Sequence, residues 1–134
     1  MALELYMVGL IARDMDTSLD FYRRLGLAIP AGSDDKTHVG VKMESGLTFF
    51  LDSRPSAWDA KPGTKADPGR VDAADGLRVI LEFYLVNRAE VETKYTELTG
   101  YGYQSRREPF ETSFGMYFAL IDDPDGNTIL LSAD

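Results

Sequence analysis

Few side chains in this sequence have the types and spacing that indicate a catalytic or metal site. The chain has no cysteine and one histidine, His38, so thiolate chemistry and disulfides are excluded. Any metal site would depend on His38 and carboxylates, and no pair of these residues has the spacing of a known ligand motif. On the sheet face described below and in its neighbourhood, acid–base chemistry would have to come from Glu82, Asp52, Tyr84 or His38. For His38 itself, the simpler interpretation is a half-exposed strand residue.

Two similar units of secondary structure are predicted to position these residues. The first contains a strand over 5–12, a helix between Asp14 or Asp16 and Gly26, and strands over 37–43 and 47–51. In the helix, apolar residues recur at steps of three and four, which indicates one buried face. Asp52 therefore directly follows the last predicted strand of the first unit.

The second unit repeats the first. It contains a strand over 77–86, a helix from the capping pair Asn87 and Glu90 to Gly100, and a hairpin of strands over 116–121 and 128–131. Aligning Tyr95 with Tyr22 also aligns Gly126 with Gly46. The segment between the units is rich in proline and glycine and predicts a linker. We expect one domain over 1–134, with module one at 1–52, a linker at 53–76 and module two at 77–134.

The overall composition limits the class of partner. The 134 residues are 44% hydrophobic, enough for one domain with a sizeable core. The net charge of −8 repels nucleic acid and anionic membranes. We see neither a signal peptide nor a spanning segment, which gives a cytoplasmic location by default.

Two stretches, VGLIARDMDTSLDFYRRLGL and IDDPDGNTILL, resemble the vicinal oxygen chelate superfamily, which includes glyoxalase I, extradiol dioxygenases and bleomycin-resistance proteins. The resemblance covers nearly the whole chain. It implies an α+β fold in which two βαβββ modules form a curved mixed sheet with flanking helices. It also implies a homodimer, with modules swapped between subunits or paired within one chain.

Enzymes of this superfamily hold a divalent metal at four positions, which correspond here to Met7, Phe50, Ile80 and Leu130. None of these side chains offers the oxygen or imidazole nitrogen that such a metal needs. The resemblance therefore implies a site without metal or other cofactor.

Residues that lie two or four positions along a strand from these four should share their face of the sheet, because side chains alternate between the two faces. They are Leu5, Gly9, Ile11, Thr48, Asp52, Glu82, Tyr84, Thr128 and Ser132. Such a face is an apolar cup with polar groups at its edges, which is typical of a small-ligand site. Alternatively, the four apolar side chains only fill the volume of a lost metal site. Glu82 favours the ligand, because a carboxylate is costly to bury without a partner, although it could also face water at an edge.

Two further stretches, EFYLVNRAEVETKYTELTGYGY and PFETSFGMYFALIDDPDGNTILL, resemble the metal-free drug-binding branch, such as mitomycin-resistance proteins. That resemblance implies stacking of a planar ligand on aromatic rings, for which Phe110, Phe114, Trp58 and Tyr84 are the candidates, although each could equally belong to the core. We expect sequestration of a ring-rich small molecule such as an antibiotic, without catalysis. The alternative is a glyoxalase- or dioxygenase-like enzyme with a non-standard site that uses Glu82 and His38.

Overall fold

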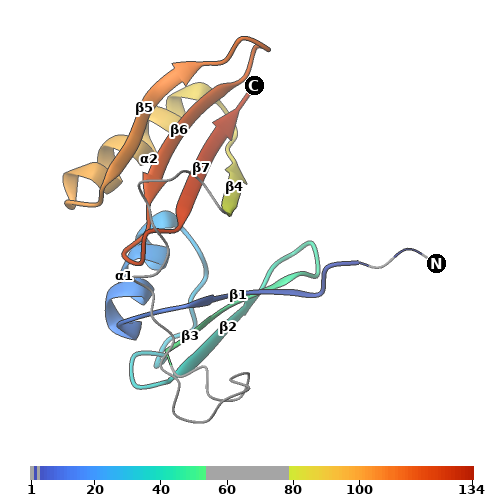
Figure 1. Cartoon of the computed structure of the whole chain (residues 1–134), viewed down its shortest axis with the longest axis vertical. Coiled ribbons are helices and arrows are strands. Elements are labelled where there is room, and N and C mark those ends of the chain that lie inside the picture. The colour runs from blue at the N-terminus through green and yellow to red at the C-terminus, as the bar shows by residue number, and fades with distance from the viewer. Residues whose placement is uncertain (1, 3, 54–78) are drawn as a thin grey trace. The chain divides into compact units, whose positions relative to one another are not determined.

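The computed structural model describes residues 2, 4–53 and 79–134 (Figure 1). The chain divides into two compact units, Met1–Val71 and Asp72–Asp134. Each unit has a mixed sheet flanked by a helix, so the fold is α+β with two βαβββ-like modules, as predicted. Neither helix in the described part of the chain is long and apolar enough to cross a membrane.

The first unit contains β1 (Met7–Ile11), α1 (Met15–Leu25), β2 (His38–Lys42) and β3 (Thr48–Asp52). Within the described residues its sheet has the order β1-β3-β2, in which β1 is parallel and β2 antiparallel to β3. Asp14 begins the helix, because its carboxylate accepts the Asp16 amide at 3.1 Å. The α1 side of this sheet is identified by the Tyr22 ring, which is fully buried and lies 5.0 Å from the ring of Phe49.

The second unit contains β4 (Ile80–Tyr84), α2 (Arg88–Gly100), β5 (Ser105–Glu111), β6 (Tyr117–Asp122) and β7 (Thr128–Ala133). The sheet order is β4-β7-β6-β5, with only the β4–β7 pair parallel. As predicted, Asn87 caps α2 by accepting the Glu90 amide at 2.9 Å. Strand β5 is an element that we did not predict from the sequence.

Figure 1 shows α2 across one face of the four-stranded sheet. That face carries Ala119, Ile121 and Ile129, all fully buried, and Tyr117, whose hydroxyl bonds to Glu92 of the helix. Because side chains alternate along a strand, neighbouring residues point to the opposite face. We call this opposite face of either sheet its outer face. The outer faces carry the residues predicted for the ligand cup.

Candidate functional site

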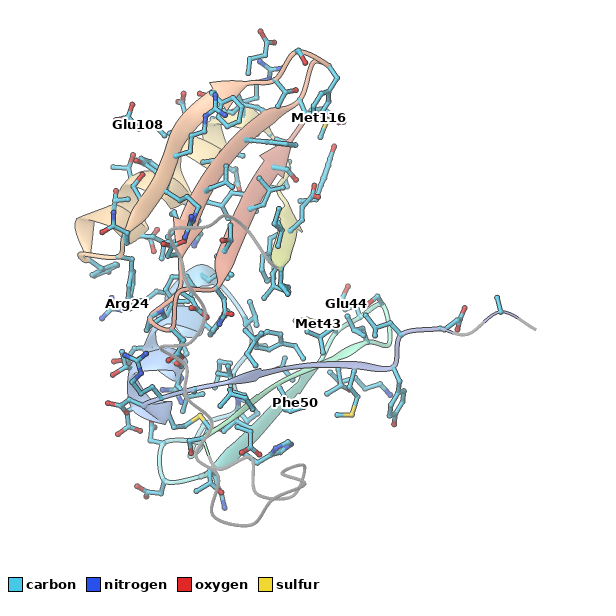
Figure 2. The ribbon with its side chains drawn as sticks, in the orientation of Figure 1. Arg24, Met43, Glu44, Phe50, Glu108 and Met116 are labelled. Atoms are coloured by element: carbon cyan, nitrogen blue, oxygen red, sulfur yellow. The ribbon has the colours of Figure 1, made fainter. Side chains whose placement is uncertain are left out.

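The outer face of the first unit is built around Phe50 (Figure 2). Register places Phe50 between Gly9 of β1 and Gly40 of β2. The outer edge of the ring covers Gly9 so closely that a Cβ there would lie 1.9 Å from the ring Cζ atom. A ring at this position therefore depends on the absence of a side chain at Gly9. Met7 lies at the start of β1 and is 39% exposed.

A histidine–carboxylate pair lies beside this ring. The His38 Nδ1 atom is 2.9 Å from Oδ2 of Asp52, and the two residues are direct partners across β2 and β3. The Asp52 side chain is 8% exposed and that of His38 is 47% exposed. The His38 ring also lies 5.0 Å from the ring of Phe50. A buried carboxylate that fixes an imidazole in this way is an arrangement used in general acid–base chemistry.

The second unit has a carboxylate on its outer face. Glu82 is exposed, and its Oε2 atom accepts a hydrogen bond of 2.7 Å from the Ser132 hydroxyl. Ser132 is fully buried and is the register partner of Tyr84. The Tyr84 hydroxyl donates to the Asp134 carboxylate at 2.5 Å, which raises the pKa of Tyr84 above its ordinary value. This edge of the sheet thus holds a carboxylate and an oriented phenol side by side.

Three phenylalanine rings lie together on the same outer face, on strands β5 and β6 and the turn between them. Phe118 of β6 contacts Phe110 edge to face, with centroids 6.0 Å apart, and Phe114 in a similar geometry at 5.7 Å. Phe114 lies between β5 and β6 and is 69% exposed. The guanidinium of Arg107 lies 3.5 Å from the centre of the Phe110 ring. Phe114 is therefore the ring of this cluster that a ligand reaches most directly.

An ion pair occurs on the outer face near the β6–β7 turn. Arg106 donates to both carboxylate oxygens of Asp122, through Nε at 2.7 Å and through a terminal nitrogen at 3.1 Å. Both side chains are mostly buried. Such a bidentate pair fixes the strand ends rather than offering a charge to a ligand.

The structure places the predicted residues in two sets. Met7 and Phe50 belong to the first unit, whereas Ile80, Glu82, Tyr84, Phe110, Phe114 and Leu130 belong to the second. Register pairs Glu82 with Leu130, so these two share a face, as the period of two predicted. Trp58 lies outside the described residues. Phe118 and the His38–Asp52 pairing were not predicted.

The four positions that bind metal in superfamily enzymes do not fit a metal ion here. They supply three hydrocarbon side chains and the thioether of Met7, whereas hard and borderline cations need oxygen or nitrogen donors. The described residues also contain no group of three or more histidine, cysteine or acidic side chains able to hold an ion.

A separate hollow of about 470 Å³ lies in the first unit, where the chain leads into β1 and passes the turn between β2 and β3. Its lining is Glu4, Leu5, Tyr6, Ser45, Gly46 and Leu47. None of these except Leu5 was predicted for the ligand cup.

Comparison with known proteins gives a family and a fold. Residues 5–131 match the family described as Glyoxalase/Bleomycin resistance protein/Dioxygenase superfamily. No curated protein matches the chain.

Solved structures share the fold at low sequence identity. A glyoxalase-related enzyme from Fulvimarina pelagi is 16% identical, with a TM-score of 0.78 over 99% of this chain and 89% of that chain. A glyoxalase/bleomycin resistance protein/dioxygenase family enzyme from Burkholderia phytofirmans PsJN is also 16% identical, with a TM-score of 0.73 over 98% of both chains. A lactoylglutathione lyase from Agrobacterium tumefaciens is 23% identical, with a TM-score of 0.67 over 99% and 95%.

Proposed function

Because the chain belongs to the glyoxalase/bleomycin resistance protein/dioxygenase superfamily, and its metal-binding positions hold no suitable ligands, we propose that it binds a small molecule without transforming it. The ligand is planar and rich in rings, such as an aromatic antibiotic. This proposal assigns the protein to the metal-free, drug-sequestering branch of the superfamily.

The observation that carries the proposal is the ring cluster on the outer face of the second unit. A fully folded core normally buries large rings, yet Phe114 is 69% exposed beside Phe118. A flat ligand that stacks on such a ring gains about 0.5–1.5 kcal/mol beyond the area that it buries. The remaining contacts that we propose in this unit come from Phe110, Tyr84, Leu130 and Ile80. A role for Met7, Phe50 and Trp58 stays a prediction from the sequence.

The Glu82 carboxylate is proposed to orient the ligand. The hydroxyl of Ser132 holds one of its oxygens at 2.7 Å, which fixes the carboxylate on the outer face. An exposed acceptor of this kind bonds to an N–H or O–H group of a ligand. Glu82 would then set the direction of a ligand that the rings hold by its flat faces.

Binding alone is sufficient for a useful function. A ligand of about 30 heavy atoms at roughly 0.3 kcal/mol per atom gains about 9 kcal/mol, which corresponds to a sub-micromolar dissociation constant. At that affinity, a protein present in excess over a toxic molecule removes most of it from solution.

We test the proposal by titrating the protein with proflavine, a planar three-ring dye, and with a panel of aromatic antibiotics. Binding is read from thermal shift and from the fluorescence of Trp58, the only tryptophan. We expect Phe114→Ala to weaken binding about fivefold. The matched control is Tyr101→Ala, which removes a ring that is 56% exposed at the end of α2. If Phe114→Ala and wild type bound these ligands with equal affinity, the proposal that the ligand stacks on Phe114 would be contradicted.

The second candidate function is a glyoxalase-type enzyme, and the His38–Asp52 pair favours it. The 2.9 Å contact would present the half-exposed imidazole of His38 to a substrate as a general base. The test is turnover of glyoxalase-type substrates by wild type, His38→Gln and Glu82→Gln. Activity that either substitution abolishes would favour the enzyme over the sequestering protein.

A further inference from the structure

The Arg88 side chain makes hydrogen bonds to three separate segments of the chain. Its guanidinium donates through Nε to the main-chain oxygen of Asp134, through Nη1 to Oε1 of Glu111 and through Nη2 to the main-chain oxygen of Gly115. Each of these three distances is 3.0 Å. The guanidinium carbon also lies 5.1 Å from the centre of the Tyr117 ring. One side chain at the start of α2 thus joins the ends of β5 and β7.

The segment that Arg88 holds is the turn carrying Phe114. Within this turn the Gly115 amide donates to the Thr112 oxygen at 3.2 Å, and the Met116 amide donates to the Thr112 hydroxyl at 2.9 Å. Figure 2 shows Met116 at the turn. Phe114 contacts the ring of Phe118 but is 69% exposed, so little packing fixes its side chain. The position of this ring therefore depends on the turn.

The other contact of Arg88 leads to the opposite edge of the sheet. Asp134 follows β7, and its carboxylate accepts the hydroxyl of Tyr84, which belongs to β4. Arg88 is bonded to the main chain of that same residue. The guanidinium consequently links the turn that carries Phe114 to the residue that holds the Tyr84 ring.

We propose that Arg88 is a positioning residue for the proposed ligand site, which fixes the Phe114 turn and, through Asp134, the Tyr84 ring. The inference rests on the proposed function and adds a residue that does not touch the ligand. Arginine suits this role better than lysine, because a planar guanidinium directs its N–H groups along several fixed directions whereas a lysine ammonium is a compact charge. With 41% of its side chain exposed, Arg88 gains from the number and geometry of its bonds rather than from burial.

The test compares wild type, Arg88→Met and Arg88→Lys by amide hydrogen exchange and by titration with proflavine. We expect exchange at Gly115 and Met116 to rise about tenfold in Arg88→Met, because the turn opens more often, and proflavine to bind about threefold to tenfold more weakly. Arg88→Lys should recover part of both effects. The matched control is Arg23→Met, which removes an equivalent charge bonded to Asp34 in the first unit and should change neither measurement.

Two results would overturn the inference while leaving the proposed function intact. The first is unchanged exchange at Gly115 and Met116 in Arg88→Met. The second is faster exchange with unchanged affinity for proflavine, which would make the contacts of Arg88 purely structural. Wild-type protein that bound neither proflavine nor any antibiotic of the panel would instead overturn the proposed function, and this inference with it.

Discussion

Phe50 stands at a position where superfamily enzymes hold a metal ligand, and its ring fits there because Gly9 has no side chain. An alanine Cβ at Gly9 would lie 1.9 Å from the ring, whereas one at Gly40 would meet no atom closer than 3.7 Å. We predict that Gly9→Ala lowers the free energy of unfolding by about 1–3 kcal/mol, because the ring must move from the sheet. Urea denaturation measures this change.

Gly40→Ala is the matched control, since it makes the same chemical change on the other side of Phe50. Its new methyl group meets only ordinary van der Waals contact with Thr48. We expect its effect on stability to be small, since alanine costs less backbone entropy than glycine. Equal losses in the two variants would show that the Phe50 ring does not occupy the space over Gly9.

Two tyrosines should make stability fall at high pH. The hydroxyls of Tyr84 and Tyr117 donate to the carboxylates of Asp134 and Glu92, and these bonds raise the pKa of each phenol above the usual 10.0. A pKa that is higher in the folded state contributes stability below the unfolded value, and this stability is lost as pH rises through the folded value. We therefore predict that stability falls as pH increases above about 10.

The measurement is urea denaturation at several pH values between about 8 and 11. The double variant Tyr84→Phe, Tyr117→Phe removes both phenols, so its stability should decline less steeply above about pH 10. Parallel pH profiles for the variant and wild type would contradict the assignment of these bonds.

At the scale of elements, helix α2 depends on its cap. The Asn87 side chain accepts the Glu90 amide at 2.9 Å. We predict that Asn87→Ala lowers the free energy of unfolding by about 1 kcal/mol, because an amide of the first turn then loses its partner. The control is Thr93→Ala at an exposed position inside the same helix. A loss in Thr93→Ala as large as in Asn87→Ala would argue against the cap.

Most elements were predictable from the sequence, and the failures have physical reasons. Strand β1 begins at Met7 rather than at Leu5. Leu5 and Tyr6 were included in the predicted strand because they are apolar, but they are 70% and 77% exposed. An apolar run alone does not show whether its side chains will be buried. Strand β5, SRREPFE, was missed because it is charged and contains Pro109. It is tolerated as an edge strand with irregular register, where a proline leaves no essential ladder bond unmade.

The candidate site was predictable only in part. The period of two placed Glu82 and Leu130 on one face of the sheet, and register pairs them. The contact between Phe114 and Phe118 depends on how the chain turns between β5 and β6, and the pairing of His38 with Asp52 depends on strand register. Neither is encoded in local spacing, which is why the sequence singled out the residues but not their partners.

At the scale of the whole molecule, we predict a homodimer. In the described residues β1 and β4 are each one of the two edge strands of their sheets, and both carry exposed apolar residues, including Met7 and Ile80. Unpaired strand edges with apolar side chains favour association with another sheet. Light scattering at micromolar concentration should give twice the mass of 14.9 kDa. A monomer would contradict this prediction.

The purified protein should also contain far less than a stoichiometric amount of any divalent metal. The side chains at the four metal-binding positions of the superfamily lack suitable donors. Elemental analysis tests this directly. Near-stoichiometric nickel, zinc, iron or manganese that disappears in His38→Gln or Glu82→Gln would instead support the enzyme.

Mass spectrometry of the recovered ligand tests the central claim most directly. The protein is saturated with a planar aromatic antibiotic or a glyoxalase-type substrate, incubated and denatured, and the released small molecule is identified by its mass, its chromatographic retention time and its fragmentation pattern. The last two readouts are needed because an isomerisation would leave the mass of a substrate unchanged. Sequestration predicts that the bound molecule returns chemically unchanged, and that Phe114→Ala retains less of it than wild type or the control Tyr101→Ala. A product that differs in any of these readouts, formed by wild type and absent with Glu82→Gln, would contradict sequestration and make the protein an enzyme.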